Sequence, residues 1–471
     1  MLTRRRLLEL TAAAGVSAFA PALRAAEGKT INDVTQLNPV TVADERKPRS
    51  ADELRAALRA WPGSISVGGG RYSMGGQIAA VGSLHLDTRA MNQVVSFDAA
   101  RHSTRVQAGM IWRDLQDVID PRDLSVKIMQ SYANFTVGGS VSVNVHGRYV
   151  GQGPLINAVQ ALQLVTANGD VLELSRTREP ELFRAVAGGY GGLGVITEVE
   201  LALDANSRIE RVVENVALEH YPAFFRDKIL TNKKMVLHNA DLTPPNFAAP
   251  RAISWVTSGN PLTEKARLVP RGLNYKLEKN AIWALTELPG GSHLRENVID
   301  RKLPRRPAVT WRNYEASQDA ASLEPRSRRL STYVLQEYFV PVENFVPFTQ
   351  RMAGILKTHQ VTALNVSIRH SPADKLSLMA WAPAEVFTFV LYYKQGTQSS
   401  ASDAVGLWTR KLIDAALELG GRYYLPYRLH ATREQFERAY PQARAFAALK
   451  TRVDPGNRLR NQLWDKYLPT R

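Results

Sequence analysis

Two segments of the sequence combine clustered glycines with hydroxyl-bearing residues. The first reads SISVGGGRYSMGGQ (residues 64–77) and the second reads NFTVGGSVSVNVHGR (residues 134–148). Glycine clusters are typical of backbone that a ligand approaches closely, because no side chain obstructs the approach. Backbone N–H groups and the hydroxyls of Ser73, Thr136, Ser140 and Ser142 could together bind a diphosphate. Tight turns are the alternative for either segment alone, but the occurrence of both favours a ligand site.

A third cluster, GGYGGLG, fits the pattern G-x-G-x-x-G at Gly189, Gly191 and Gly194. In dinucleotide-binding proteins that pattern leaves a strand and opens a helix, which places the phosphates at the helix N-terminus. Here a helical segment precedes the cluster and a strand follows it. We therefore exclude an NAD-type fingerprint and interpret these glycines as letting the chain pass close to the face or edge of a flat ligand.

The elements that position these clusters mix helices with hairpins. A capping box at residues 50–53 precedes apolar residues at helical spacing, and two alternating runs flank the turn Asn168-Gly169. Hairpins rather than repeated strand–helix–strand units favour an α+β fold over a doubly wound sheet. Towards the C-terminus, residues 402–421 and 432–454 are each predicted to be helical, with residues 422–431 extended between them.

The N-terminus does not belong to the globular part. Arginines at positions 4 to 6 precede an Ala-rich apolar run and the small-residue site Ala20-Pro21-Ala22, which is typical of a twin-arginine export signal. A retained basic amphipathic helix is the alternative, and the run is too short for a membrane span. Export of this kind carries folded proteins and suggests a cofactor and a periplasmic location. Removing the four arginines and one glutamate of residues 1–25 lowers the net charge from +16 to +13.

The sequence contains no cysteine, so thiolate metal sites, thiol nucleophiles and cysteinyl cofactor bonds are excluded. We predict no metal site. The basic stretch 295–329 lacks the interleaved aromatic residues of a single-strand nucleic-acid platform, and we expect no nucleic-acid partner.

The motifs SVGGGRYSMGGQ, LHLDTRAMNQVVSFD, RVQAGMIWRDL, TVGGSVSVNVHGRYVGQGPL and LFRAVAGGYGGLGVITEVEL follow one another over residues 48–205. In this order they resemble the FAD-binding domain of the vanillyl-alcohol oxidase / p-cresol methylhydroxylase flavoproteins. The closing segment, with Asp454, Pro455 and Asn461, is similar to that of the sugar-lactone oxidase branch. The resemblance implies a two-subdomain FAD-binding domain over 26–205, after the signal peptide 1–25. An α+β substrate (cap) domain over 206–420 would follow, and then a segment 421–471 that returns to the flavin.

The resemblance also implies how FAD is held. The first two loops would bind its pyrophosphate, and the third would lie near the isoalloxazine or ribityl chain. The expected FAD-binding residues are Val67, Gly68, Gly69, Gly70, Arg71, Tyr72, Ser73, Gln77, Thr136, Val137, Gly138, Gly139, Ser140, Ser142, His146, Gly191, Gly194, Val195, Ile196 and Asn461.

One departure from the family concerns attachment of the flavin. Many relatives carry a histidine where this chain has Tyr72, and that histidine bonds covalently to the flavin 8α-methyl group. Because position 72 is not a histidine and the chain has no cysteine, we predict non-covalent FAD. An 8α-O-tyrosyl bond through Tyr72 is the alternative.

Other departures concern the substrate side. The branch has a Glu-x-Arg strand in the cap, and this chain reads Ser367-Ile368-Arg369, so the arginine is kept and the glutamate is missing. The branch also places a lysine near the flavin where this chain reads Tyr427-Arg428-Leu429-His430. We therefore predict Arg369, Tyr427 and His430 as catalytic residues, with Arg369 or His430 stabilising negative charge and His430 as a possible base. Structural roles, a backbone-bonded His430 and a cap salt bridge at Arg369, are the alternatives.

These features predict an exported FAD-dependent oxidoreductase that oxidises a small alcohol, sugar or lactone-like substrate by hydride transfer to flavin N5. Electrons would pass to O₂ or to a carrier. Two alternatives remain open: a dehydrogenase of the same fold that uses a quinone or carrier protein, and a flavin-binding protein without turnover.

Overall fold

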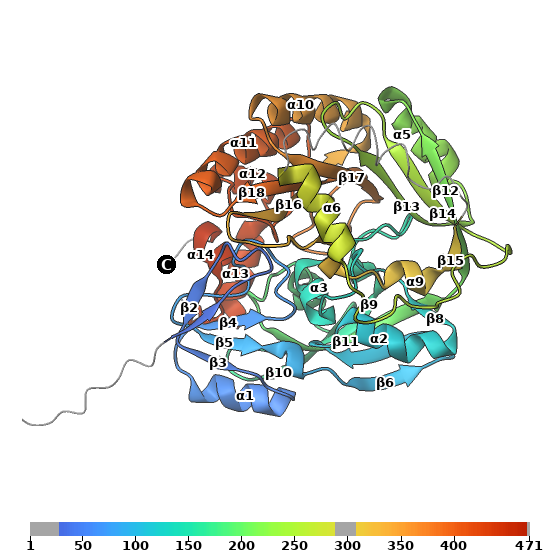
Figure 1. Ribbon diagram of the computed structural model, residues 1–471. Helices are drawn as coiled ribbons and strands as arrows, with labels where there is room; N and C mark the ends of the chain where they lie inside the picture. Colours follow the sequence, from blue (N-terminus) through green and yellow to red (C-terminus); the bar gives the residue numbers. More distant parts are fainter. Residues whose placement is uncertain (1–27, 288–307, 469–471) are drawn as a thin grey trace, which may run out of the picture.

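The computed structural model describes residues 28–287 and 308–468. The expected signal peptide and residues 295–307 of the basic stretch 295–329 therefore lie outside the described residues. Within them, the chain up to Ala205 forms three small sheets in the lower half of Figure 1, and a larger sheet lies above these. The last helices, in red, pack beside both halves. This mixture of helices with parallel and antiparallel strands confirms the α+β class.

The N-terminal sheets surround the first glycine segment. A parallel sheet has the order β3–β5–β4, and helix α1 connects β3 to β4. Helix α1 begins after Ser50, whose side chain accepts a hydrogen bond from the Glu53 N–H, and it buries Leu54 and Leu58. The elements are β1 (Lys29–Ile31), β2 (Val40–Val42), β3 (Asp44–Arg46), α1 (Ala51–Ala60), β4 (Ile65–Gly68) and β5 (Leu84–Asp87).

An antiparallel sheet with the order β10–β9–β11–β7–β6, to which β8 is joined through β11, carries the second and third glycine clusters between its elements. The predicted hairpin is present: Val165 pairs with Val171 across the turn, and Gly169 has a φ of +87°. The elements are β6 (Val94–Asp98), β7 (Ser103–Gln107), α2 (Trp112–Ile119), β8 (Leu124–Val126), α3 (Val137–Val143), β9 (Val159–Val165), β10 (Val171–Ser175), α4 (Pro180–Val186) and β11 (Val195–Ala205).

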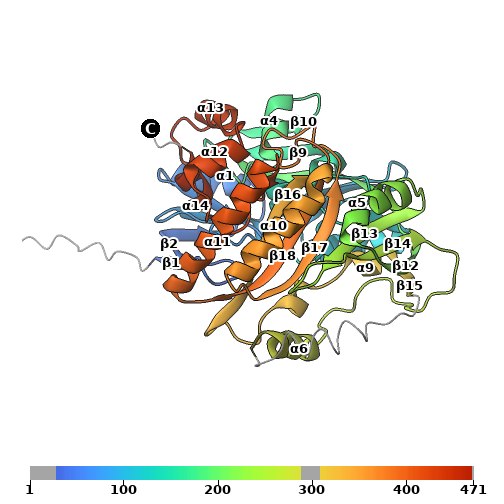
Figure 2. The same ribbon diagram turned by 90° about the horizontal axis from the view of Figure 1, so that it is seen from above.

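The upper layer is a sheet of eight strands, counted over the described residues, in the order β15–β12–β14–β13–β17–β18–β16–β19. Figure 2 shows α10 and α11 lying side by side across one face of β16, β17 and β18. Phe345, Phe348, Met352 and Leu356 recur at helical spacing on α10 and are buried. That packing leaves the other face of these strands for the cavity described below. The strands are β12 (Arg208–Asn215), β13 (Met235–Leu242), β14 (Arg251–Thr257), β15 (Val309–Trp311), β16 (Ser331–Pro341), β17 (Ala363–Ser371), β18 (Val386–Gly396) and β19 (Arg422–Tyr423). The helices are α5 (Tyr221–Phe224), α6 (Lys276–Glu287), α9 (Arg312–Ala316), α10 (Phe345–Thr358) and α11 (Ser399–Glu418).

The C-terminal segment differs from its prediction in two ways. The helix predicted over 432–454 is interrupted around Pro441, because proline lacks the N–H that a continuous helix would need. The extended segment predicted over 422–431 forms a strand only at Arg422–Tyr423, and the rest is loop. The segment then returns to the first sheet, where Leu459 bridges Ile65. The helices are α12 (Arg433–Ala439), α13 (Ala443–Val453) and α14 (Gln462–Tyr467).

The chain passes from the antiparallel sheet to the eight-stranded sheet between Ala205 and Arg208. The proposed domain boundaries remain an interpretation of the sequence. None of the helices in residues 28–287 and 308–468 is both long and apolar enough to span a bilayer.

Candidate active site

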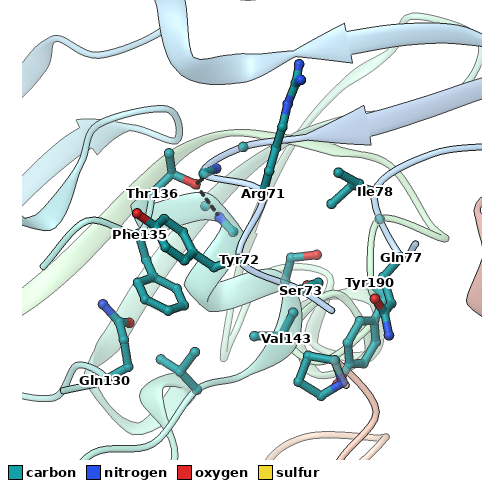
Figure 3. A pocket seen from close by; sticks show the side chains of 18 of the residues that line it. Arg71, Tyr72, Ser73, Gln77, Ile78, Gln130, Phe135, Thr136, Val143 and Tyr190 are labelled. Carbon is teal, nitrogen blue, oxygen red and sulfur yellow. Dashed lines mark hydrogen bonds between the residues drawn. The ribbon is translucent and has the colours of Figure 1, made fainter. Parts of the chain in front are cut away.

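A cavity lies between the glycine-rich loops and the face of the eight-stranded sheet that α10 and α11 leave uncovered. Its empty space, including the open mouth, is about 1460 Å³. Figure 3 shows part of its wall, to which the first loop contributes Tyr72, Ser73 and Gln77 and the segment 130–143 contributes Gln130, Phe135 and Val143. Side chains of the sheet, among them Leu335, Glu337, Arg369 and Val390, complete the lining.

The first and second glycine loops are joined directly to each other. The Thr136 hydroxyl accepts hydrogen bonds from the N–H groups of Gly70 and Gly139, at 3.3 Å each (Figure 3). A side chain on Gly69 would collide with that hydroxyl, so glycine is required there for the loops to meet. Gly138 is likewise packed on Ala108, where an added Cβ would lie 2.6 Å from the Ala108 Cβ. The two glycine loops therefore form a single wall.

The third loop is held by the C-terminal segment through three backbone carbonyls. Trp464 Nε1 donates to the Gly189 carbonyl at 3.0 Å, and Asn461 Nδ2 donates to the Tyr190 carbonyl at 2.8 Å. Lys450 Nζ donates to the Gly192 carbonyl at 3.0 Å. Because the loop lines the cavity, these buried side chains fix the shape of one part of its wall.

The sheet side of the cavity carries a buried glutamate that the sequence reasoning missed. Glu337 on β16 is 3% exposed, and its Oε1 lies 2.5 Å from His146 Nε2. Tyr427 donates its hydroxyl proton to Glu337 Oε2 at 3.3 Å. Burial opposes ionisation of Glu337, but the nearby His146 and Arg369 outweigh it and hold the pKa of this carboxyl below its usual range. Burial first, and then the charge of Glu337, raises the pKa of Tyr427 well above its usual value, so the phenol stays a donor.

Strand register explains how the chain can lack a glutamate at position 367 and still present one to the cavity. Glu337 pairs with Val390, and Val390 pairs with Ser367 on the next strand. Directly opposed residues in an antiparallel sheet project from the same face. Glu337 thus stands in the same row as Ser367, two strands away. An acidic residue at an inward position of the apolar run YVLQEYFV was the signal that could have identified it.

Arg369, for which the sequence predicts a catalytic role, also lines the cavity. Its Nε is shielded from solvent and has no hydrogen-bond partner among the described residues. Burial lowers the pKa of Arg369, while the charge of Glu337 opposes that shift. A guanidinium with an unused donor in a cavity is suited to bind an oxygen atom of a ligand.

Tyr72 lies at the position where the family resemblance implies a histidine bonded to the flavin. Its ring stacks on Phe135 with centroids 4.2 Å apart and planes 19° apart, as Figure 3 shows. Burial, together with the charges of Glu324 and Asp319, raises the pKa of Tyr72 to about 12.

The structure corrects the assignment of His430. This histidine is not among the residues that line the cavity, and its ring faces Gly406 on α11. Burial and the cations Arg428, Lys466 and Arg410 lower the pKa of His430 to about 3. A neutral imidazole outside the cavity can neither stabilise charge on the flavin nor act as the base there.

Most of the other expected FAD-binding residues line the cavity, and five do not. Gly68, Val137 and Val195 are buried in their elements, and Ser140 binds Trp112 and Gln130 instead of facing the cavity. Asn461 acts on the third loop from behind, as described above. The residues that do line it are Val67, Gly69, Gly70, Arg71, Tyr72, Ser73, Gln77, Thr136, Gly138, Gly139, Ser142, His146, Gly191, Gly194 and Ile196. In the described residues, no group of three His, Asp or Glu side chains could hold a metal ion.

The wall fits the cofactor expected from the sequence. The loops have glycines where a Cβ would obstruct the approach of a second loop, and they leave backbone and hydroxyl groups facing a long cavity. Its floor carries Arg369 with an unused donor. These features suit a ligand that has both phosphates and a flat ring system.

Comparison with known proteins gives the same result. Residues 46–175 match the family model of an FAD binding domain, and residues 256–467 match that of D-arabinono-1,4-lactone oxidase. L-gulonolactone oxidase of Bos taurus is 23% identical over 446 residues, which cover 89% of this chain and 94% of the bovine protein. Decaprenylphosphoryl-beta-D-ribose oxidase of Mycolicibacterium smegmatis is 23% identical over 425 residues, 85% of this chain and 88% of that protein.

A mitochondrial L-galactono-1,4-lactone dehydrogenase of Brassica oleracea is 30% identical over 200 residues, which cover 42% of this chain and 31% of that protein. Both domain models and the relatives of nearly full length agree with the motifs and the cavity. FAD is therefore the cofactor, and the protein is an oxidoreductase. The chain belongs to the FAD-dependent oxidoreductases of the vanillyl-alcohol oxidase / p-cresol methylhydroxylase type, in the branch of the sugar-lactone oxidases and dehydrogenases.

Proposed function

We propose that the protein oxidises a hydroxyl group of a small neutral sugar, sugar lactone or polyol. The observation that carries this proposal is the composition of one cavity, where the glycine loops meet a floor that holds both Glu337 and Arg369. A carboxylate accepts hydrogen bonds and a guanidinium donates them, so the pair suits a ligand rich in hydroxyl groups. The names of two relatives, which mention a sugar lactone and a ribose derivative, support the same class of substrate.

When bound, FAD supplies an acceptor for the hydride that leaves the substrate carbon. The protein contributes orientation and control of protons. The first two loops would hold the phosphates, and the third loop, which includes Tyr190, would border the flat ring system. Arg369 is placed to bind an oxygen atom of the substrate, which fixes the C–H bond for transfer.

FAD is held without a covalent bond in this proposal. Tyr72 stands at the position where the family resemblance implies an anchor. The raised pKa of its phenol keeps it protonated, and its ring stacks on Phe135. We further propose that residues 1–25 direct export by the twin-arginine route and that O₂ or an electron carrier reoxidises the flavin.

Mixing the purified holoenzyme with candidate substrates under anaerobic conditions tests this function. The compounds are L-gulonolactone, D-arabinono-1,4-lactone, D-ribose and sorbitol. Bleaching of the flavin absorbance by at least one of them is expected. Reoxidation by air is then compared with reoxidation by a dye, which separates an oxidase from a dehydrogenase. A flavin that none of these compounds reduces would contradict the proposal and favour a binding protein without turnover.

A further inference from the structure

We propose that Glu337 receives the hydroxyl proton of the substrate, and that His146 and Tyr427 are the residues that position its carboxylate. This assignment rests on the oxidation proposed above. The proposed proton acceptor lies on β16. It differs from position 367 on β17, where the family resemblance led us to expect a glutamate.

The hydrogen bonds of Glu337 leave room for a substrate. A carboxylate offers about four lone-pair positions. His146 uses one on Oε1 and Tyr427 uses one on Oε2. The Thr388 side chain also lies close enough to lower the pKa of this carboxyl. Because Glu337 lines the cavity, its remaining lone pairs are the ones available to an incoming hydroxyl group.

The surroundings of His146 and Glu337 favour one arrangement of the protons on these two side chains. Nδ1 of His146 is buried and has no hydrogen-bond partner among the described residues. A proton there would be a buried donor without an acceptor, which is costly. His146 is therefore best satisfied with its proton on Nε2, donated to Glu337. The carboxylate then carries the negative charge, and the nearby Arg369 balances it.

The position of Arg369 completes the argument. Arg369 lies two residues beyond Ser367 on β17 and pairs with Thr388, so it projects from the same face as Glu337 but further along the strands. A substrate between the two would place one hydroxyl at Glu337 and a neighbouring oxygen at Arg369. The proposed substrate thus has adjacent oxygens.

The reaction balances with these groups. The C–H bond breaks with its electron pair and the hydride leaves for bound FAD. The O–H bond breaks at the same centre, a C=O bond forms, and the proton moves to Glu337, which becomes a carboxylic acid. The carboxylic acid releases this proton when the electrons leave the enzyme.

Glu337→Gln tests the assignment, because glutamine keeps the shape but cannot accept the proton. The rate of flavin reduction is followed anaerobically with whichever of L-gulonolactone, D-arabinono-1,4-lactone, D-ribose and sorbitol reduces the wild type fastest. Proton transfer by a positioned group contributes about 10²–10⁴-fold to the rate, so we expect a loss of that order. The wild-type rate should fall as the pH falls and Glu337 becomes protonated. The Gln variant should lose this dependence, and Glu337→Asp should recover part of the rate.

Glu385→Gln is the matched control. Glu385 also pairs with a histidine, His370, at 2.7 Å, but neither residue lines the cavity. The control should reduce its flavin at the wild-type rate. If Glu337→Gln also does so, or keeps the wild-type loss of rate at low pH, the assignment is overturned while the proposed function stands. If no compound reduces the wild type, the proposed function fails and the assignment fails with it.

A measurement on the apoproteins tests the assignment even if Glu337→Gln binds FAD poorly. Glu337 has a lowered pKa in the folded protein, against about 4.3 for an unperturbed glutamate. Its stabilising contribution is therefore present at higher pH and is lost as the pH falls through the folded-state value. Urea unfolding of the apoproteins should show this loss in the wild type and not in Glu337→Gln. A wild type that instead loses stability relative to Glu337→Gln as the pH rises would show that Glu337 is protonated in the folded protein, which overturns the assignment.

Discussion

Tyr72 occupies the point in the first loop where the family resemblance implies a covalent anchor, and its surroundings keep it a phenol. With a pKa of about 12, only a minor fraction is phenolate at neutral pH, and the ring is held against Phe135. We therefore predict that acid precipitation of the purified protein leaves FAD in the supernatant. Tyr72→Phe should give the same result with a similar FAD content. Flavin that stays in the wild-type pellet but leaves the Phe variant would show a tyrosyl bond.

His430 gives a second prediction at this scale, through stability. Its pKa is about 3 in the folded protein and about 6.5 for an unperturbed histidine, so folding favours the neutral ring. Its contribution to stability is present above about pH 6.5 and is lost as the pH falls below that value.

Between pH 7 and pH 5, the free energy of unfolding of the wild type should therefore fall more steeply than that of His430→Asn, as measured by urea titration. The pH profile of flavin reduction should be the same in both proteins, because His430 lies outside the cavity. A changed pH profile of flavin reduction would restore its predicted role as a base.

Residue types were easier to predict from the sequence than residue positions across the sheet. The glycines and Thr136 were identified because local conformation requires those residue types. Glu337 was missed because its place beside Arg369 depends on the pairing of β16 with β18 and of β18 with β17. His430 was misplaced because a loop of the C-terminal segment turns its ring towards α11, and no pattern in the sequence specifies that direction.

The elements that join the loops carry a prediction about Gly69. An added Cβ there would collide with the hydroxyl of Thr136, which connects both loops. Gly69→Ala should therefore separate the loops and abolish FAD loading, as measured by flavin absorbance per protein. Gly354→Ala on α10 is the control, since nothing lies within 4 Å of the added atom. Full FAD loading of Gly69→Ala would show that the loops do not hold the cofactor in this way.

The C-terminal segment carries another prediction. Trp464→Phe removes only the donor to the Gly189 carbonyl and keeps most of the packing. A hydrogen bond contributes about 0.5–1.5 kcal/mol, so FAD should bind roughly 2- to 13-fold more weakly. Trp408→Phe on α11, a buried tryptophan outside the cavity, is the matched control and should leave the affinity unchanged. Flavin fluorescence titration of the apoproteins measures both. Unchanged affinity in Trp464→Phe would show that this contact does not shape the site.

Element prediction succeeded where the signals were local. The Ser50 cap and the Asn168-Gly169 turn specify their helix and hairpin directly, and the structure confirms both. The break near Pro441 shows the limit of reading helical spacing without weighing proline. The order of the eight strands could not be predicted, because neighbours such as β13 and β17 are distant in the sequence.

At the scale of the whole molecule, the arginines at positions 4 to 6 carry the export proposal. Residues 1–25 fused to a reporter protein should deliver it folded to the periplasm, and replacing Arg4, Arg5 and Arg6 by lysine should stop delivery. Cell fractionation measures this. Delivery of the reporter despite the three lysines would contradict the twin-arginine route.

The three donors behind the third loop, Lys450, Asn461 and Trp464, lie downstream of every other part of the cavity wall. A growing chain on the ribosome consequently cannot close that wall until residue 464 has emerged. Cofactor capture is then expected to follow synthesis of this segment, and a chain that stops short of residue 450 should remain colourless however well its glycine loops fold. Loading with flavin would therefore report that synthesis has passed residue 464.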